Sequence, residues 1–474
     1  MKKRIYISER FVRKALFVWG VILSILYSLI SVGEYRRYAP RGMDLGTYDQ
    51  ALWLYSRFSG FYNTVLRRHI LGDHFTLTLP LLSPLYWIWD DVQVLLLFQA
   101  IWICLSLIPV YQLARIRRFS PWVSIGVAVV YSVFFGIQQA MFSDFHPVVV
   151  GTGLLLWVAY FFEAKYYYRF YLALVLLLCT QENMGIALVC LGIIYLFDFR
   201  YRRRAWWFIP VGLFATVFSM LFVAQFYSIG YEYKAVVSSS IIQNFQLLFD
   251  SPNKVLSWWY SYISFGFLPI FSVGSTLAVL VDMAQYFNTG SAAYFKDTPY
   301  THHRIMLAPL LLFGLLETLQ RLKNSRCRLG WIVMGLIILN IFIIARYRFP
   351  LYEVFTKRYW TQEQWMKDAD MFTKRLPTPM KVSASPDIVP HIAHRQYIYV
   401  AELTQRSDIP GCMSPCWWLD VGEHAEYLLL RWTSKESFQH TMIFDSYGQA
   451  VKNMGIHGVL KEVDRHGEMV LFAL

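Results

Sequence analysis

Long apolar runs that recur between short basic clusters constrain this 474-residue chain more than any other feature. The runs extend from residue 15 to residue 346, and a helix needs roughly 20 residues to cross a bilayer. Only 16% of the residues are charged, whereas a soluble domain carries about 25%. The pattern therefore predicts an all-α polytopic membrane protein with about eleven spans. It excludes a disordered chain and argues strongly against an ordinary soluble enzyme.

The basic clusters set the expected topology, because Lys and Arg in short loops stay in the cytoplasm. The clusters are Lys2, Lys3, Arg4, Arg10, Arg13 and Lys14; Arg115, Arg117 and Arg118; Lys165 and Arg169; Arg200, Arg202, Arg203 and Arg204; and Arg321, Lys323, Arg326 and Arg328. Placing all of them inside predicts an integral protein of the cytoplasmic (inner) membrane with its N-terminus inside and its C-terminal segment outside. The basic residues behind the net charge of +13 then orient the protein in the bilayer. Because this explains the charge, no nucleic-acid partner is expected.

Two apolar stretches, 170–197 and 261–287, allow two interpretations. Each is either one long helix or two short ones, broken around Gln181-Glu182-Asn183 or Val273-Gly274. The first apolar run has no small-residue cleavage site after it, so we interpret it as a retained span rather than a signal peptide.

Composition divides the chain into two expected domains. Residues 1–346 form the transmembrane domain, in which 34–92 is the first outer loop. Residues 347–474 contain more prolines and acidic residues and have strand-like runs at Gln396–Val400 and Tyr427–Arg431, which predict a small extracytoplasmic α/β domain. Cys412 and Cys416 in this tail form either a disulfide or two free thiols.

The first candidate site residues are two carboxylates just after the first span. Apolar residues recur at helical spacing from Leu45 to Phe58 and predict an amphipathic helix on the outer surface. Asp44 is either a general base beside the membrane or a helix cap for the amide of Thr47. Asp49 follows by about 500° of helical rotation, so it lies on another face, and it is either a site residue or a solvated helix position.

The next candidates lie in the same loop. Arg67 and Arg68 either hold a phosphate or contact lipid headgroups. Asp73 and His74 position a proton carrier, hold a hydroxylated substrate, or form a local hydrogen-bond network in the loop.

Three further polar groups adjoin later spans. Asp144 and His146 precede Pro147 at the start of a helix, where Asp144 is either a site residue or a turn residue. Glu182 lies within an apolar stretch, where a carboxylate is costly, and it either serves function or breaks the helix. His302, His303 and Arg304 either bind phosphate or a metal, or form a polar interface belt.

All of these groups fall on the outer face under the topology that the basic clusters predict. We therefore expect a single cavity at that face to gather Asp44, Asp73, His74, Asp144, His146, Glu182 and His302.

Ordered motifs along nearly the whole chain resemble a known family. They are Asp44-Leu45-Gly46-Thr47-Tyr48-Asp49-Gln50-Ala51-Leu52-Trp53; Asp73-His74-Phe75 with Pro84-Leu85-Tyr86; Asp144-Phe145-His146-Pro147; Gln181-Glu182-Asn183; Tyr300 to His303; and Val382-Ser383-Ala384-Ser385 with Pro390-His391-Ile392 and Arg395. Together they resemble the membrane-protein family called domain of unknown function 2079. The family more often has Lys-Glu-Asp where this chain has Gln181-Glu182-Asn183, which leaves Glu182 in place.

The resemblance implies a GT-C-like fold, because that family is grouped with the GT-C glycosyltransferases. It implies transfer of a sugar from a polyprenyl-phosphate donor in the bilayer to an extracytoplasmic glycan, lipid or protein acceptor. The catalytic carboxylate of GT-C enzymes follows the first span, which implies Asp44 first and Asp49 second. Arg67, Arg68, His302, His303 and Arg304 are then candidates for holding the leaving lipid phosphate.

No cofactor is certain from the sequence. Some relatives use a divalent metal, which stays possible here, although no convincing set of ligands is present. Two alternatives to the enzyme stay open: a non-catalytic assembly or binding protein of the same fold, and a transporter or flippase.

Overall fold

The computed structural model describes residues 9–39, 43–226, 240–288, 296–323, 329–412, 414–432 and 442–474. Of the predicted basic clusters and cysteines, Lys2, Lys3, Arg4, Arg326, Cys327 and Arg328 lie outside the described residues. The chain divides into two compact units. The helical unit comprises Met1–Val32, Leu71–Leu79 and Leu95–Tyr359, and the mixed unit comprises Gly33–Ile70, Pro80–Val94 and Trp360–Leu474.

The division groups most of the first outer loop with the tail rather than with the spans. Residues 33–70 and 80–94 belong to the mixed unit, whereas 71–79 belong to the helical unit. The expected domain boundary between residues 346 and 347 stays a prediction.

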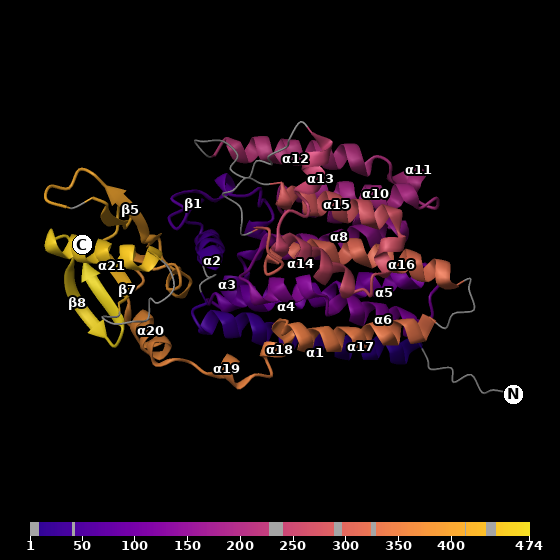
Figure 1. Cartoon of the computed structure of the whole chain (residues 1–474), viewed down its shortest axis with the longest axis horizontal. Helices are drawn as coiled ribbons and strands as arrows, with labels where there is room; N and C mark the ends of the chain where they lie inside the picture. Colours follow the sequence, from indigo (N-terminus) through magenta and orange to yellow (C-terminus); the bar gives the residue numbers. More distant parts are fainter. Residues whose placement is uncertain are drawn as a thin grey trace. The chain divides into compact units, whose positions relative to one another are not determined.

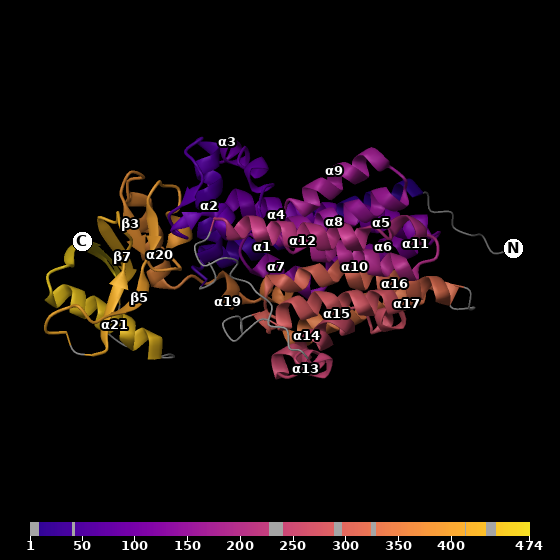
Figure 2. The same cartoon turned by 90° about the horizontal axis from the view of Figure 1, so that it is seen from above.

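Apolar helices that run side by side in both views make up the helical unit (Figures 1 and 2). Within the described residues, five helical segments are long and apolar enough to cross a membrane. They are α1 (Glu9–Arg36); α4 and α5 (Gln93–Leu105 and Leu107–Ile116); α11 and α12 (Arg202–Ala205 and Phe208–Ala224); η5 and α16 (His302–Met306 and Leu307–Lys323); and α17 (Leu329–Tyr347). A further pair, α6 (Pro121–Ser132) and α7 (Phe135–Phe142), passes the same test with a bend of 45°.

Shorter apolar helices complete this unit. They are α8 (Pro147–Glu163), α9 (Tyr167–Leu178), α10 (Met184–Phe197) and α15 (Val273–Phe287), with α13 (Ile241–Gln246), α14 (Pro252–Ile263), α18 (Pro350–Glu353) and α19 (Lys357–Trp360) in the connections. These segments are roughly consistent with the expected number of about eleven spans. The predicted helical membrane fold is confirmed.

Both ambiguous stretches consist of two helices. Between α9 and α10, the polar residues 180–183 form a turn. In the second stretch, α14 ends at Ile263 and α15 begins at Val273, with the 3-10 helix η3 (Leu268–Phe271) between them. The hydroxyl of Ser272 accepts a hydrogen bond from the amide of Ser275 at 3.3 Å, so it caps α15 and fixes where that helix starts.

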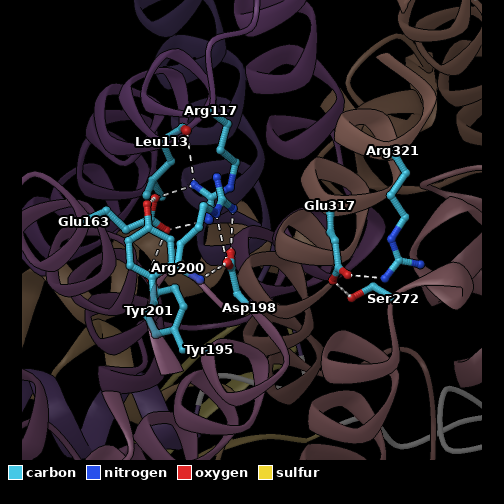
Figure 3. A network of polar contacts seen from close by, with 10 residues as sticks. All are labelled: Leu113, Arg117, Glu163, Tyr195, Asp198, Arg200, Tyr201, Ser272, Glu317 and Arg321. Carbon is cyan, nitrogen blue, oxygen red and sulfur yellow. Dashed lines mark hydrogen bonds and ion pairs between the residues drawn. The ribbon is translucent and has the colours of Figure 1, made fainter. Parts of the chain in front are cut away.

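A buried ion pair joins the ends of three helices in this unit (Figure 3). Arg117, just after α5, donates to both carboxylate oxygens of Glu163 at the end of α8, at 2.7 and 2.5 Å. The hydroxyls of Tyr195 in α10 and of Tyr201 each donate to Glu163 at 3.0 Å. The Glu163 carboxylate is fully buried, so all of its charge is compensated from within the protein. The position of Arg117 in a basic loop cluster did not indicate this role.

The mixed unit contains a five-stranded sheet, which confirms the predicted α/β tail. The strand order is β4-β3-β7-β9-β8, in which β3, β4 and β7 are parallel and the β7–β9 and β9–β8 pairs are antiparallel. Its strands are β3 (Val382–Ala384), β4 (Ile398–Val400), β7 (Tyr427–Arg431), β8 (Lys461–His466) and β9 (Met469–Ala473), and β5 (Glu402–Arg406) pairs separately with β6 (Cys416–Asp420). The strand-like runs of the sequence correspond to β4 and β7. Cys412 and Cys416 form a disulfide.

Side chains alternate between the two faces of this sheet, as a pleated strand requires. Leu429 and Leu471 pack with α20 (Gln364–Arg375) on one face. Leu428, Leu430 and Phe472 pack with α21 (Met442–Ile456) on the other. Each face thereby buries one apolar row under one helix.

The helix after the first span, α2 (Met43–Ser56), forms as predicted but does not lie on the surface. Every residue from 45 to 52 is buried, so the expected amphipathic surface helix is wrong. The tail encloses α2: a Cβ added to Gly46 would lie 2.8 Å from Val389 in η6 (Val389–His391). The Gln50 amide also donates to Thr64 at 2.7 Å and to the carbonyl of Arg395 at 3.2 Å. The remaining loop elements are β1 (Tyr62–Asn63), β2 (Arg68–His69), η1 (Ile70–Gly72), η2 (Leu79–Leu82) and α3 (Leu85–Ile88).

Candidate functional site

A buried histidine–glutamate pair forms the centre of the candidate site in the helical unit. His74 follows η1, and Glu182 lies in the break between α9 and α10. The Nδ1 atom of His74 lies 2.7 Å from one oxygen of Glu182, and the backbone amide of Phe75 donates to the other at 3.1 Å. The polar break in the apolar stretch therefore places Glu182 against a loop residue 108 positions earlier in the chain.

Electrostatics keeps this pair charged near neutral pH. Burial alone would lower the pKa of His74, but the carboxylates of Glu182 and Asp73 raise it to about 9. Burial alone would raise the pKa of Glu182, but His74 and the amide of Phe75 lower it. Asp73 lies 3.7 Å from the Nε2 atom of His74, so two carboxylates flank one imidazolium.

Further imidazole rings are stacked in the same unit. His146, which precedes α8, stacks on His302 with ring centroids 3.4 Å apart. His302 meets His303 at 4.1 Å, and His303 stacks on Tyr286 at 4.7 Å. The backbone carbonyl of Asp144 lies 2.9 Å from Nδ1 of His146.

The turn that holds Glu182 contacts this stack, because the Asn183 amide donates to the hydroxyl of Tyr286 at 3.0 Å. The helical unit thereby places Asp73, His74, Asp144, His146, Glu182, His302 and His303 around one region, as their shared predicted face suggested.

Arg304 is fully buried beside the stack. Its guanidinium donates to the backbone carbonyls of Lys296 and Thr298, the latter at 3.4 Å, and faces the ring of Phe287 at 4.8 Å. The arginine thus orders the segment before η5 while keeping a positive charge in the interior.

Three acceptor atoms near the pair have no hydrogen-bond partner among the described residues. They are Oε1 of Gln181, Oδ1 of Asn183 and Oδ2 of Asp282, and all are buried. Asp282, in α15, is 0% exposed, and its other oxygen accepts from the Gln285 amide at 2.8 Å. A buried acceptor without a donor is costly, so these atoms suit a ligand that carries several hydroxyl groups.

Asp282 is not among the site residues predicted from the sequence. The available signal was the one that identified Glu182: a carboxylate inside an apolar run is costly and marks a site by default.

Metal ligands are not grouped in the part of the chain that the structure describes. No set of three or more His, Cys, Asp or Glu side chains there has the arrangement to hold a metal ion.

The two candidate carboxylates of α2 belong to the mixed unit and differ sharply. Asp44, in the first turn, is exposed. Asp49 is 0% exposed, so the alternative of a solvated Asp49 is wrong. Its Oδ1 atom accepts from the hydroxyl of Tyr86 and lies 3.0 Å from Nε2 of His394. The other imidazole nitrogen of His394 lies 3.3 Å from Asp90. The sequence around His394 contains no motif that indicates its contacts with Asp49 and Asp90.

The two candidate arginines also belong to the mixed unit. Arg67 forms an ion pair with Asp420 of β6, donates to the carbonyl of Val400 at 3.3 Å, and faces the ring of Tyr399 at 5.8 Å. Arg68 lies in β2, opposite Asn63 of β1. Arg67 thus connects the loop to the tail. The sequence instead predicted that it holds a phosphate or contacts lipid headgroups.

Residues 41–411 match the model of the family described as "Predicted membrane protein (DUF2079)". The chain belongs to the DUF2079 family. The resemblance seen in the sequence motifs is therefore confirmed, and no curated protein matches this DUF2079 protein significantly.

Two structures of ArnT are among the solved structures that match this DUF2079 protein. One is ArnT from Cupriavidus metallidurans bound to undecaprenyl phosphate, with a TM-score of 0.54, 12% sequence identity, and coverage of 96% of this chain and 97% of ArnT. The other is the same ArnT in the apo state, with a TM-score of 0.53, 12% identity, and coverage of 97% and 98%. At this identity the likeness shows the fold alone, and it extends over nearly the full length of both chains.

We expect His394→Gln to lower the free energy of unfolding of this DUF2079 protein by about 1–3 kcal/mol, because Asp49 would remain buried after losing a charged partner. Burial alone would lower the pKa of His394, but Asp49 and Asp90 raise it, so the cation persists at pH 6. Thermal unfolding of the full-length protein in detergent at pH 6 measures the effect. The exposed His424 supplies the control variant His424→Gln, and an equal loss in both variants would contradict the role of His394.

Proposed function

We propose that this DUF2079 protein is a membrane glycosyltransferase that moves a sugar from a polyprenyl-phosphate donor to an acceptor. The observation that carries the proposal is the shared fold with ArnT along nearly the whole of both chains, since one of those ArnT structures contains undecaprenyl phosphate. The geometry of the polar groups in the helical unit agrees with such a substrate in two respects, one for its sugar and one for its phosphate.

The unpaired buried acceptors suit the sugar. Each hydroxyl of a sugar offers one donor, and Gln181, Asn183 and Asp282 each hold an acceptor that has no partner among the described residues. Binding would supply the donors that these buried atoms lack, which favours a polyhydroxylated ligand over an apolar one. Selectivity among sugars would then follow from which hydroxyls reach these three acceptors.

The cationic groups suit the phosphate. His74 is held as an imidazolium by Glu182, and Arg304 is a fully buried cation in the same unit. His302 and His303 add ring N–H donors beside them. The phosphate of a leaving polyprenyl phosphate carries growing negative charge, and preformed donors stabilise it in the transition state.

Asp44 is the residue we propose as the general base, with Asp49 as a positioning residue. Asp44 is exposed, so an acceptor hydroxyl can reach it, whereas Asp49 is buried. Asp44 would take the proton of the acceptor hydroxyl while the acceptor oxygen bonds to the anomeric carbon. The bond from that carbon to the phosphate oxygen breaks, and the lipid phosphate leaves with the electron pair, which inverts the anomeric centre.

The topology is part of the proposal. With the basic clusters inside, the N-terminus lies in the cytoplasm, and residues 347–474 and the first loop lie outside the inner membrane. The acceptor is then an extracytoplasmic glycan, lipid or protein.

Transfer from a panel of radiolabelled polyprenyl-phosphate sugars in membranes tests the function. We expect Asp44→Asn to reduce transfer about 100-fold, because a positioned base contributes at least that factor. Asp408→Asn, at an exposed tail carboxylate paired with Arg406, is the matched control and should retain transfer. Equal transfer by wild type and Asp44→Asn would refute the proposed base but not the reaction. No transfer by the wild type from any verified donor would favour the non-catalytic or transport alternatives.

A further inference from the structure

The start of α1 carries a hollow that the proposed reaction does not use. It is lined by Glu9, Arg10, Arg13, Lys14 and Phe17 and has a volume of about 560 Å³. Ligand sites in proteins commonly measure about 300–1,000 Å³, so the hollow has room for a phospholipid headgroup. None of its lining residues belongs to the His74–Glu182 region.

Charge in and around this hollow is strongly positive. Glu9 is already engaged by two cations, Arg13 at 3.1 Å and Arg115 at 3.8 Å. In the described part of the chain, neither Arg10 nor Lys14 has an ion-pair partner. Both side chains are exposed, so they are available to an anion.

An apolar stripe leads away from the hollow along the same helix. Phe17, Val21 and Ile25 recur at four-residue spacing and are 72%, 43% and 56% exposed. They belong to a candidate membrane span of which only 28% of the most apolar window is buried by protein. In a bilayer these side chains therefore face lipid chains, with the cationic hollow at one end of the stripe.

We propose that the start of α1 is a binding site for one anionic phospholipid. The headgroup phosphate occupies the hollow between Arg10 and Lys14, and an acyl chain follows the stripe from Phe17 to Ile25. The cationic hollow and the apolar stripe together select this ligand. The two cations favour a headgroup with a net negative charge over a zwitterionic one. The stripe favours a ligand whose headgroup carries a hydrocarbon chain. Basic residues alone are enough to orient a protein in the membrane. A lipid-binding site additionally requires the hollow, with the apolar stripe on the same side of the helix. The inference is independent of the proposed glycosyl transfer.

Native mass spectrometry of the full-length protein in detergent tests the site, with titrations of phosphatidylglycerol and phosphatidylcholine. We expect the wild type to retain phosphatidylglycerol selectively. The double variant Arg10→Gln/Lys14→Gln should bind it about 30-fold more weakly, which corresponds to about 1 kcal/mol for each cation. The control Arg202→Gln/Arg203→Gln removes the same charge from two exposed arginines elsewhere and should change binding less than threefold. Equal retention of the two lipids by the wild type, or equal losses in the two double variants, would overturn the proposal.

Two further experiments complete the test. The first distinguishes a bound lipid from free phosphate, and the second uses only the wild type, so it does not depend on a variant that folds. Phe17→Ala keeps every charge, so it should weaken phosphatidylglycerol but leave inorganic phosphate unaffected. Full displacement of the lipid by millimolar inorganic phosphate, with no effect of Phe17→Ala, would show a phosphate site and overturn the lipid assignment. The second experiment needs no variant. The selectivity of the wild type for phosphatidylglycerol should fall as NaCl rises from 0.1 to 0.5 M, because the headgroup contact is electrostatic. Selectivity that does not change with salt would overturn the proposal.

Discussion

Glu163→Gln is expected to lower the free energy of unfolding by about 3–5 kcal/mol. The substitution keeps the size of the side chain but leaves the guanidinium of Arg117 buried without its counter-charge. The side chains of Arg117 and Glu163 are 4% and 0% exposed, so water cannot replace the lost partner. Thermal and denaturant unfolding of the purified protein in one detergent measures the difference, with helicity as the signal.

Another ion pair drawn in Figure 3 provides the matched control. Glu317 and Arg321 are one helical turn apart in α16, and their side chains are 31% and 58% exposed. Glu317→Gln should therefore cost less than about 1 kcal/mol. The double variant Arg117→Met/Glu163→Leu should recover much of the loss, because it removes both buried charges together. A Glu163→Gln variant as stable as Glu317→Gln would show that the buried pair contributes little.

Raising the pH from 6 to beyond 9 should remove a stabilising contribution on the order of 3 kcal/mol at the His74–Glu182 pair. The pKa of His74 is about 9 in the folded protein, against about 6.5 for an ordinary histidine. A group whose pKa is raised by folding binds its proton more tightly in the folded state. Its contribution is therefore complete below about pH 6.5 and is lost as the pH rises through 9.

Unfolding measured between pH 6 and pH 10 checks this dependence. His74→Gln should remove that part of the slope, whereas His424→Gln, at an exposed histidine, should leave it unchanged. The two variants would show the same pH dependence if the pair were not charged in the folded protein. Because His74 also carries the proposed phosphate contact, we expect transfer by wild type to decline over the same range.

Several features of the site could be predicted because they depend on short stretches of sequence. Glu182 stood out since a carboxylate in an apolar stretch carries a high desolvation cost wherever it occurs. His146 and His302 came from different motifs but were expected on one face, and their rings stack at 3.4 Å. Asp282 follows the same desolvation rule, because it too is a carboxylate inside an apolar run.

Other features could not be predicted, because they depend on partners that lie far apart in the sequence. Asp49 and His394 are separated by 345 residues, and the sequence around either residue does not indicate the other as its partner. The burial of α2 likewise results from the tail packing over it, whereas the helix by itself has the spacing of a surface element. Arg117 was interpreted only through its basic neighbours, since its partner Glu163 follows 46 residues later.

The sequence by itself determined that the chain is a membrane protein, where polar residues interrupt its apolar runs, and which family its motifs resemble. Apolar length and the cost of burying charge are properties of each segment, so they can be evaluated without a fold. The tertiary structure alone decided which polar groups are paired and which acceptors are left for a ligand. Those outcomes depend on the packing of distant segments, because a buried charge or hydrogen-bonding group is stable only where the fold supplies its partner.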